Sequence, residues 1–187
     1  MVVVALSVGA ASLVGLWWLL GGRQFELYGL DHVVLNVADA QYWLNMGYWE
    51  SPADTFGDAA RALADRVGKA ARLHEASVLM DVGCGCAEPD LHWARKHRGL
   101  RHIVGITNER TQVLLAQARI QSAGMTDRIT IQQGDASALA SARLETPFDA
   151  VISLDSAYHY NTRQAFFAGS FALLRSGTPR TTFWDRY

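Results

Sequence analysis

The sequence predicts an α/β fold in which helices cover both faces of a parallel sheet. The first observation is a series of four short apolar runs of the buried-strand type, at 77–82, 102–107, 128–133 and 148–155. The second is that segments with helical spacing of apolar residues follow three of these runs, at 88–97, 109–123 and 162–174. Alternation of strands and helices at this interval is typical of βαβ units, which build parallel sheets.

Composition divides the chain into three regions. Residues 1–23 are almost wholly apolar, residues 24–52 form a mixed lead-in segment, and residues 53–187 hold the alternating pattern, opened by an amphipathic helix at 54–73. The third region has the size of one domain, so we expect a single folded unit there.

The N-terminal region predicts a membrane anchor. Residues 2–22 carry no charge and reach the roughly 20 apolar residues that a helix needs to cross a bilayer. Trp17 and Trp18 lie near the end of the run and Arg23 follows it, which favours a single-pass protein whose domain faces the cytosol, with the endoplasmic reticulum as a candidate membrane. A cleaved signal peptide is the main alternative, although no basic residue precedes the run. A buried core helix is the other alternative, although it would be expected to show a polar face.

Charge and cysteine content exclude several classes of protein. The formal net charge of the 187 residues is −1, which gives no electrostatic attraction to nucleic acid. Cys84 and Cys86 cannot form a disulfide framework and favour a reducing compartment, and the six histidines lack metal-ligand spacing. We therefore expect no nucleic-acid partner and no metal site.

The most informative motif is VLMDVGCGCAEPD at 78–90. Asp81 lies at the end of the first predicted strand, and Gly83, Cys84 and Gly85 follow it. Glycines allow a tight turn and close approach of a ligand, and the next helix offers free N–H groups, so the motif predicts a nucleotide site. The alternative is a tight strand–helix turn that binds nothing. An acidic residue before the glycines, rather than about 20 residues after them, disfavours an NAD-dependent oxidoreductase.

An acidic strand end followed by G-x-G resembles the first motif of class I S-adenosylmethionine-dependent methyltransferases, and the resemblance covers residues 42–174. It implies a Rossmann-like fold and S-adenosylmethionine as cofactor. By this likeness Asp81 anchors the loop and the methionine end of the cofactor, while Gly83, Cys84 and Gly85 lie against its ribose and amino-acid part. Ala87 stands in place of the usual third glycine, which is tolerable if its φ is negative.

The ends of the second and third predicted strands supply further cofactor contacts by the same resemblance. Thr107 and Asn108 stand where many relatives carry an acidic residue for the ribose. The run GIT at 105–107, followed by Gln112, looks like the branch of tocopherol, sterol and cyclopropane-fatty-acid enzymes. Asp135 and Ala136 would contact the adenine. The alternatives are that Thr107 only ends a strand, that Asn108 caps the next helix, and that Asp135 forms an ordinary turn.

The end of the fourth predicted strand, LDSAYHYNTR, is where we expect catalysis. His159 is the candidate base, because the unperturbed pKa of histidine is about 6.5. Asp155 is expected to touch the cofactor, and Tyr158 or Tyr160 to position the substrate. The alternative for His159 is a residue at a helix start that bonds only to its neighbours.

Two further features bear on the lead-in segment and the glycine turn. Four aromatic residues resemble the segment that covers the cofactor in the lipid and small-amine branches, or else pack on the sheet: Tyr42, Trp43, Tyr48 and Trp49. For Cys84 and Cys86 we expect packing rather than redox chemistry.

The sequence leads to a membrane-anchored methyltransferase acting on a lipid or other hydrophobic small molecule. A close variant acts on a soluble small amine. The segment 181–185 could begin a fifth strand, but a complete domain of this family continues with a further reversed pair, so the sheet is expected to be incomplete at the C-terminus. A catalytically inactive cofactor-binding fragment or splice product is therefore the main alternative.

Overall fold

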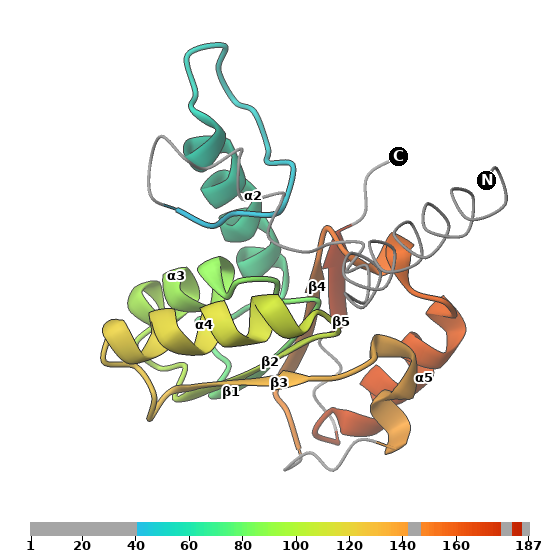
Figure 1. Cartoon of the computed structure of the whole chain (residues 1–187). Coiled ribbons are helices and arrows are strands. Elements are labelled where there is room, and N and C mark those ends of the chain that lie inside the picture. Colours follow the sequence, from blue (N-terminus) through green and yellow to red (C-terminus); the bar gives the residue numbers. More distant parts are fainter. Residues whose placement is uncertain (1–40, 142–146, 177–180, 185–187) are drawn as a thin grey trace, which may run out of the picture.

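A computed structural model describes residues 41–141, 147–176 and 181–184 of the chain (Figure 1). Its helices, strands and 3₁₀ turns follow in the order α2 (Phe56–Ala70), β1 (Val78–Val82), α3 (Glu88–Lys96), β2 (His102–Thr107), α4 (Arg110–Ser122), β3 (Ile129–Gln133), η2 (Ala136–Ser141), β4 (Ala150–Leu154), η3 (Ala157–His159), α5 (Arg163–Leu173) and β5 (Thr181–Trp184). The predicted strands and helices are confirmed, with ends shifted by a few residues.

The strands form one parallel sheet in the order β3-β2-β1-β4-β5. In the centre of the sheet, Asp81 of β1 lies opposite Gly105 of β2 on one side and Ile152 of β4 on the other. The chain runs outward from β1 to β3 and then returns to place β4 beside β1. The strand order therefore reverses between β1 and β4, and ligands of such sheets bind outside the carboxyl ends of the strands at this point.

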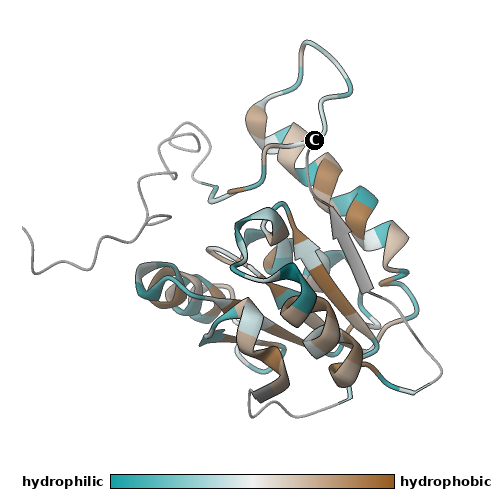
Figure 2. Cartoon of the chain, turned by 90° about the vertical axis from the view of Figure 1, so that its right-hand side faces the viewer, coloured by the Kyte–Doolittle hydropathy of each residue, from teal (hydrophilic) through white to brown (hydrophobic). Residues whose placement is uncertain are grey.

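Two apolar cores lie on opposite faces of the sheet, because successive strand residues point to opposite sides. Leu79 and Ile103 join the core that packs under α2, α3 and α4, whereas their neighbours Met80 and Val104 join the core under η2 and α5. Figure 1 shows these two helical layers on either side of the strands. Figure 2 shows hydrophobic residues in the strands and a mixture of hydrophobic and hydrophilic residues along the helices. Helices on both faces of the sheet are thus confirmed.

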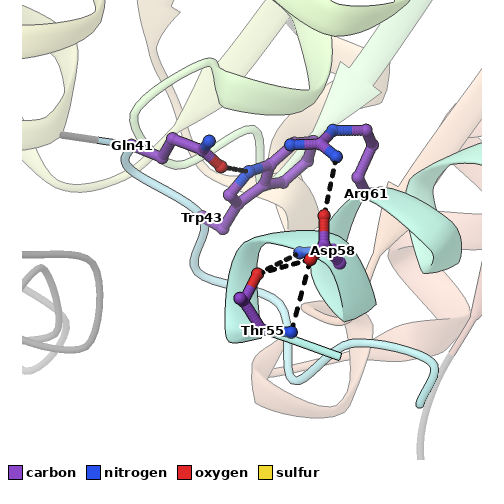
Figure 3. Close-up of polar contacts among 5 residues, drawn as sticks. All are labelled: Gln41, Trp43, Thr55, Asp58 and Arg61. Atoms are coloured by element: carbon purple, nitrogen blue, oxygen red, sulfur yellow. Dashed lines mark hydrogen bonds and ion pairs between the residues drawn. The ribbon is translucent and has the colours of Figure 1, made fainter. Parts of the chain in front are cut away.

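A capping box fixes the start of α2 (Figure 3). Thr55 accepts a hydrogen bond from the backbone N–H of Asp58, and the Asp58 carboxylate accepts one from the backbone N–H of Thr55. The Thr55 hydroxyl also donates to Asp58 Oδ2 at 2.7 Å, and the two bonds that the Asp58 carboxylate accepts from Thr55 lower the pKa of Asp58, which pairs with Arg61 at 3.0 Å as well. Residue 54 of the predicted helix therefore stays outside it, because the capping bonds need an extended residue at 55.

Trp93 of α3 joins α3 to α2 in the core. Its side chain is fully buried, and its indole Nε1–H donates to the carbonyl of Ala64 at 3.0 Å. We expect Trp93→Phe to lower the free energy of unfolding by about 1–3 kcal/mol, because a buried carbonyl loses its donor. Denaturant unfolding followed by circular dichroism measures this. The matched control is Trp49→Phe at a half-exposed indole, where a change above about 0.5 kcal/mol would contradict the role of burial.

The predicted membrane anchor at residues 2–22 lies outside the described residues. Within 41–141, 147–176 and 181–184, no helix is long and apolar enough to cross a membrane.

Candidate functional site

One cavity of about 530 Å³ lies at the carboxyl ends of the strands. Every site residue that the sequence predicted lines it, on four successive segments that follow β1, β2, β3 and β4: Asp81, Gly83, Cys84 and Gly85; Thr107, Asn108 and Gln112; Asp135 and Ala136; Asp155, Tyr158, His159 and Tyr160. Residues up to 79 positions apart in sequence, such as Asp81 and Tyr160, are thus brought together. Their individual roles remain predictions.

The turn after β1 is held tightly against β2. The N–H groups of Gly83 and Cys84 both donate to the carbonyl of Ile106, at 2.7 and 3.0 Å. Gly83 has φ +82°, and a Cβ atom there would lie 2.2 Å from Ser156 Oγ. Gly85 has φ +57°, and a Cβ atom there would lie 2.7 Å from Leu44 Cδ1. Both positive φ values favour glycine, and at Gly83 the space is restricted as well, whereas the flexible end of Leu44 could move away from a Cβ atom at Gly85.

Ala87 corrects one expectation. Its φ is +60°, not negative, and it stands as the N-cap of α3. A non-glycine residue in the left-handed region carries strain of about 1–2 kcal/mol. The turn thus keeps the conformation of the usual third glycine although the residue is alanine.

Asp81 presents an unsatisfied carboxylate to the cavity. The residue is 1% exposed, and within the described part of the chain neither carboxylate oxygen has a hydrogen-bond partner. Burial raises the pKa of Asp81 well above its usual value, and the nearby charge of Asp90 raises it further. Buried polar groups are normally hydrogen-bonded, so a ligand with a cationic or hydroxyl donor fits this position.

The segment after β2 contains a residue that the sequence analysis missed. Thr107 Oγ1 donates to Gln112 Oε1 at 2.7 Å, which ties the strand end to α4. Glu109 follows two residues later, is 7% exposed and lines the cavity. It was missed because the acidic residue was expected at the strand end itself, although a carboxylate so close to that end was a usable signal. The N-cap of α4 is Glu109, so the alternative capping role for Asn108 is wrong.

Asp135 lines the cavity and also forms a turn. Its Oδ1 accepts a hydrogen bond from the N–H of Ser137 at 2.7 Å, which starts η2. Ala136 is buried at the same turn. The turn and the predicted adenine contact are therefore compatible.

Asp155 follows β4 in the left-handed region, with φ +53°. Its Oδ2 accepts a hydrogen bond from the N–H of Met46 at 2.7 Å, while its buried Oδ1 has no partner among the described residues. Asp155 therefore joins the N-terminal segment to the sheet and leaves one oxygen for a ligand. The sequence analysis did not find this contact, which joins residues 109 positions apart.

Tyr160 supports the glycine turn through its hydroxyl. The hydroxyl donates to the carbonyl of Val82 at 2.7 Å and lies 2.9 Å from the hydroxyls of Ser153 and Ser156. Burial is the main cause that raises the pKa of Tyr160. A substrate that contacted the Tyr160 hydroxyl would compete with Val82, Ser153 and Ser156 for its hydrogen bonds.

We expect Tyr160→Phe to lower the free energy of unfolding by about 1–2 kcal/mol, because the hydroxyl network around the Val82 carbonyl loses its centre. Thermal and urea unfolding measure this. Tyr48→Phe removes a hydroxyl from a residue outside the cavity lining and is the control. Equal stability of Tyr160→Phe and wild type would show that the network does not support the turn.

His159 lies on the exposed wall of the cavity. It is the last residue of η3 rather than the start of a helix, and its ring lies against that of Tyr158, tilted by 55° with 4.0 Å between the ring centroids. Tyr158 is 41% exposed. His159 itself is exposed to solvent and also lines the cavity.

The N-terminal segment contributes one of its four predicted aromatic residues to the cavity. Tyr42 lines it, and Arg119 holds Tyr42 by placing its guanidinium 4.6 Å from the ring centre. Trp43 is 2% exposed in the core, where its Nε1–H donates to Gln41 (Figure 3). Tyr48 packs partly buried against the same core, and Trp49 is half exposed. For Trp43 and Tyr48 the packing interpretation is the one that the structure supports.

The two cysteines are buried and unpaired. Burial raises the pKa of Cys84 well above its usual value and that of Cys86 to about 11. High thiol pKa values suit packing rather than nucleophilic or redox chemistry. The described segments contain no group of three His, Cys, Asp or Glu side chains that could hold a metal ion.

The lining suits the cofactor that the sequence predicted. S-adenosylmethionine carries an ammonium group, two ribose hydroxyls and an adenine amino group, all of them hydrogen-bond donors. The cavity offers carboxylates for them, at Asp81, Glu109, Asp135 and Asp155. The unpartnered buried oxygens of Asp81 and Asp155 would be satisfied by such donors.

Comparisons with known proteins agree with this geometry. A family model described as a methyltransferase domain matches residues 79–177. Erythromycin 3''-O-methyltransferase of Saccharopolyspora erythraea is 33% identical over 153 residues, which cover 82% of this chain and 48% of that protein. 27-O-demethylrifamycin SV methyltransferase of Amycolatopsis mediterranei is 30% identical, over 73% of this chain and 50% of the relative. The chain thus spans about half the length of these curated relatives.

Among solved structures, that of the (4+2)-cyclase SpnF superposes with a TM-score of 0.67 at 28% identity, covering 80% of this chain and 55% of SpnF. The family match begins within β1 and extends past α5, so it includes each of the four strand ends that build the cavity. The chain therefore belongs to the methyltransferase domain family, whose cofactor is S-adenosylmethionine.

Proposed function

We propose that this chain is the cofactor-binding part of an O-methyltransferase that methylates a hydrophobic small molecule. The observation that carries the proposal is the buried carboxylate of Asp81, which lines a cavity at the switch point of the sheet and has no partner for either oxygen among the described residues. The names of the two relatives, both oxygen methyltransferases of antibiotics, support an oxygen acceptor.

In the proposed reaction, Asp81 and Asp155 bind the cofactor and His159 transfers the proton. S-adenosylmethionine, when bound, supplies an electrophilic methyl group. Asp81 and Asp155 hold donors of the cofactor and so fix its orientation, which lowers the entropic cost of bringing two reactants together. His159 accepts the proton of the acceptor hydroxyl and passes it to solvent, since its ring lies on an exposed wall.

Apolar side chains at the wall of the cavity support a hydrophobic acceptor. Met46 and Tyr158 line the cavity and are 43% and 41% exposed, which is unusual for large apolar groups that serve only packing. Leu44, Pro89 and Leu154 continue the apolar lining inward. A lipid and a polyketide-like molecule share this chemistry, and the sequence resemblance to the lipid branch favours the lipid.

The test uses the full chain and S-adenosylmethionine carrying a labelled methyl group. Incubation with lipid extract, with aqueous extract and with macrolide hydroxyl compounds is followed by counting the label in each product fraction. The proposal expects label in organic-phase products bearing a new O-methyl group. Label found only in water-soluble amines would favour the small-amine variant and contradict a hydrophobic acceptor.

Cofactor binding without methyl transfer is the second candidate function. It is favoured by the likeness to SpnF, which is named a cyclase rather than a methyltransferase. Binding of S-adenosylhomocysteine without label transfer to any fraction is the result that supports it.

We also propose that residues 2–22 hold the protein at a membrane. The support is the uncharged run itself, and an enzyme held at a bilayer surface meets a dissolved hydrophobic substrate directly. Carbonate extraction of membranes from cells that express the full chain tests this. The wild type is expected to stay in the membrane pellet, and Leu13→Arg with Leu16→Arg to be released; release of the wild type would contradict the anchor.

A further inference from the structure

A second carboxylate lies buried beside Asp81 and outside the lining of the cavity. Asp90, in the first turn of α3, is fully buried, and within the described segments neither of its oxygens has a hydrogen-bond partner. Asp81 lies in β1 and Asp90 in the first turn of α3, so the glycine turn joins the two short segments that carry them. The charge of Asp90 adds to burial in raising the pKa of Asp81. The turn between β1 and α3 therefore encloses two acidic side chains with four unsatisfied oxygens.

Asp81 and Asp90 cannot both stay ionised in this buried turn without a cation or a hydrogen-bond donor beside them. Moving a charge out of water costs several kcal/mol unless an opposite charge or hydrogen bonds offset the lost hydration. Repulsion between two like charges adds to that cost. Burial raises the pKa of Asp90 to about 7, although its own backbone N–H and the charge of Arg119 act in the opposite direction. The pair therefore keeps a proton near neutral pH.

The groups around the pair do not neutralise it. Arg119 of α4 is the cation whose charge reaches Asp90, but its guanidinium already contacts the Cys86 carbonyl, the Glu88 carboxylate and the Tyr42 ring. In the glycine turn, burial and then the charges of both carboxylates raise the pKa of the Cys84 thiol. In the segment after β4, burial is the main cause that raises the pKa of the Tyr160 hydroxyl, and the charge of Asp81 adds to it. Neither Cys84 nor Tyr160 is a cation at neutral pH.

We propose that Asp90 is a positioning residue of the cofactor site: it acts through Asp81, and the acidic pair holds one proton until the cationic end of the cofactor binds and displaces that proton to solvent. This inference rests on the proposed function, because it needs a ligand whose charge compensates the pair. It explains why folding leaves two carboxylates unsatisfied next to a cavity, since the ligand supplies the missing charge.

The signs of the two linked equilibria follow from the raised pKa. An isolated aspartate of pKa 3.8 is ionised in the unfolded chain, while the folded chain keeps the proton up to about pH 7. The folded chain thus binds more protons, so its stability falls as pH rises between these values. Binding of a cation favours the ionised pair, so ligand affinity rises with pH, by about tenfold between pH 6 and pH 8 for a group of pKa about 7.

The test is titration calorimetry of the full chain with S-adenosylhomocysteine at pH 6, 7 and 8, in buffers of different ionisation enthalpy. For wild type we expect up to one proton released per ligand below pH 7 and the tenfold rise in affinity. Asp90→Asn cannot lose a proton, so its affinity is expected to stay flat with pH, at or below the wild-type value at pH 6. Comparing the two variants cancels the titration of the ligand's own amine.

Two further variants separate the pair from general effects. Asp127→Asn removes an exposed carboxylate just before β3, at the opposite edge of the sheet, and is expected to bind as wild type does. Asp81→Asn is expected to lose about 10–100-fold in affinity at pH 8, as for a lost charge-assisted hydrogen bond. Without ligand, Asp90→Asn is expected to unfold at a higher temperature than wild type at pH 8. If Asp90 had only a structural role, its replacement would lower both the stability and the affinity for the ligand.

The outcomes distinguish this inference from the proposed function. Wild-type binding with no proton release, or an Asp90→Asn protein with the wild-type pH profile, overturns the role of Asp90 and leaves the cofactor site intact. Absence of binding by wild type at every pH overturns the proposed function, and the acidic pair as a cofactor feature with it.

Discussion

Replacing His159 with glutamine is expected to lower kcat for methyl transfer by about 10²–10⁴, the usual contribution of a positioned general base. Glutamine keeps the size and polarity of the side chain but cannot accept a proton at neutral pH. His159 lies on the exposed wall of the cavity, away from the buried carboxylates of Asp81 and Asp155, so the substitution is expected to leave these carboxylates in place. Affinity for S-adenosylhomocysteine is therefore expected to stay within about twofold of wild type.

The measurement is the initial rate of label transfer at saturating cofactor, together with the Kd of S-adenosylhomocysteine. His74→Gln is the matched control, because this histidine is exposed and lies after α2, away from the cavity. A His159→Gln enzyme with the kcat of wild type would remove His159 from the catalytic mechanism. A parallel loss of affinity would instead give it a role in cofactor binding.

Replacing Gly83 with valine is expected to reduce affinity for S-adenosylhomocysteine by more than about 100-fold. A Cβ atom there would lie 2.2 Å from Ser156 Oγ and 2.8 Å from the Tyr160 hydroxyl, and the φ of +82° disfavours a branched residue. Relief of the clash must move the turn or the hydroxyl network, and both adjoin the cavity. Calorimetry or equilibrium dialysis measures the loss.

Gly124 supplies a control for strain alone. It has a similar φ of +65° after α4, but a Cβ atom there would meet nothing within 4 Å. Gly124→Ala is expected to lower the free energy of unfolding by about 1–2 kcal/mol and to leave affinity unchanged. Gly83→Ala, with its smaller side chain, keeps the experiment informative if the valine protein does not fold. A folded Gly83→Ala protein with wild-type affinity would show that the turn does not touch the ligand.

The local pattern of the chain was sufficient to predict the sheet and the helical layers. Runs such as 102–107 are short, apolar and flanked by helix-patterned segments, and each became a buried parallel strand. The strand ends then identified the site, because the carboxyl ends of parallel strands lie at one edge whatever the details of the loops. This is why residues as distant as Asp81 and Asp155 could be assigned to one cavity.

What the sequence could not predict depends on contacts between distant segments. The φ of Ala87 is set by packing of the turn and not by the preference of alanine. The bond from Met46 to Asp155 joins parts of the chain that no local pattern links. Asp90 looks like an ordinary acidic residue in the first turn of a helix, and only the fold shows that it is buried beside a second carboxylate.

The most direct test of the central claim compares two nucleotides on the unaltered protein. Titration calorimetry of the full chain is carried out with S-adenosylhomocysteine and, separately, with NAD. A site built on an acidic residue before the glycine turn is expected to bind one S-adenosylhomocysteine per chain and to give no measurable heat with NAD. Binding of NAD, or no binding of S-adenosylhomocysteine, would contradict the account.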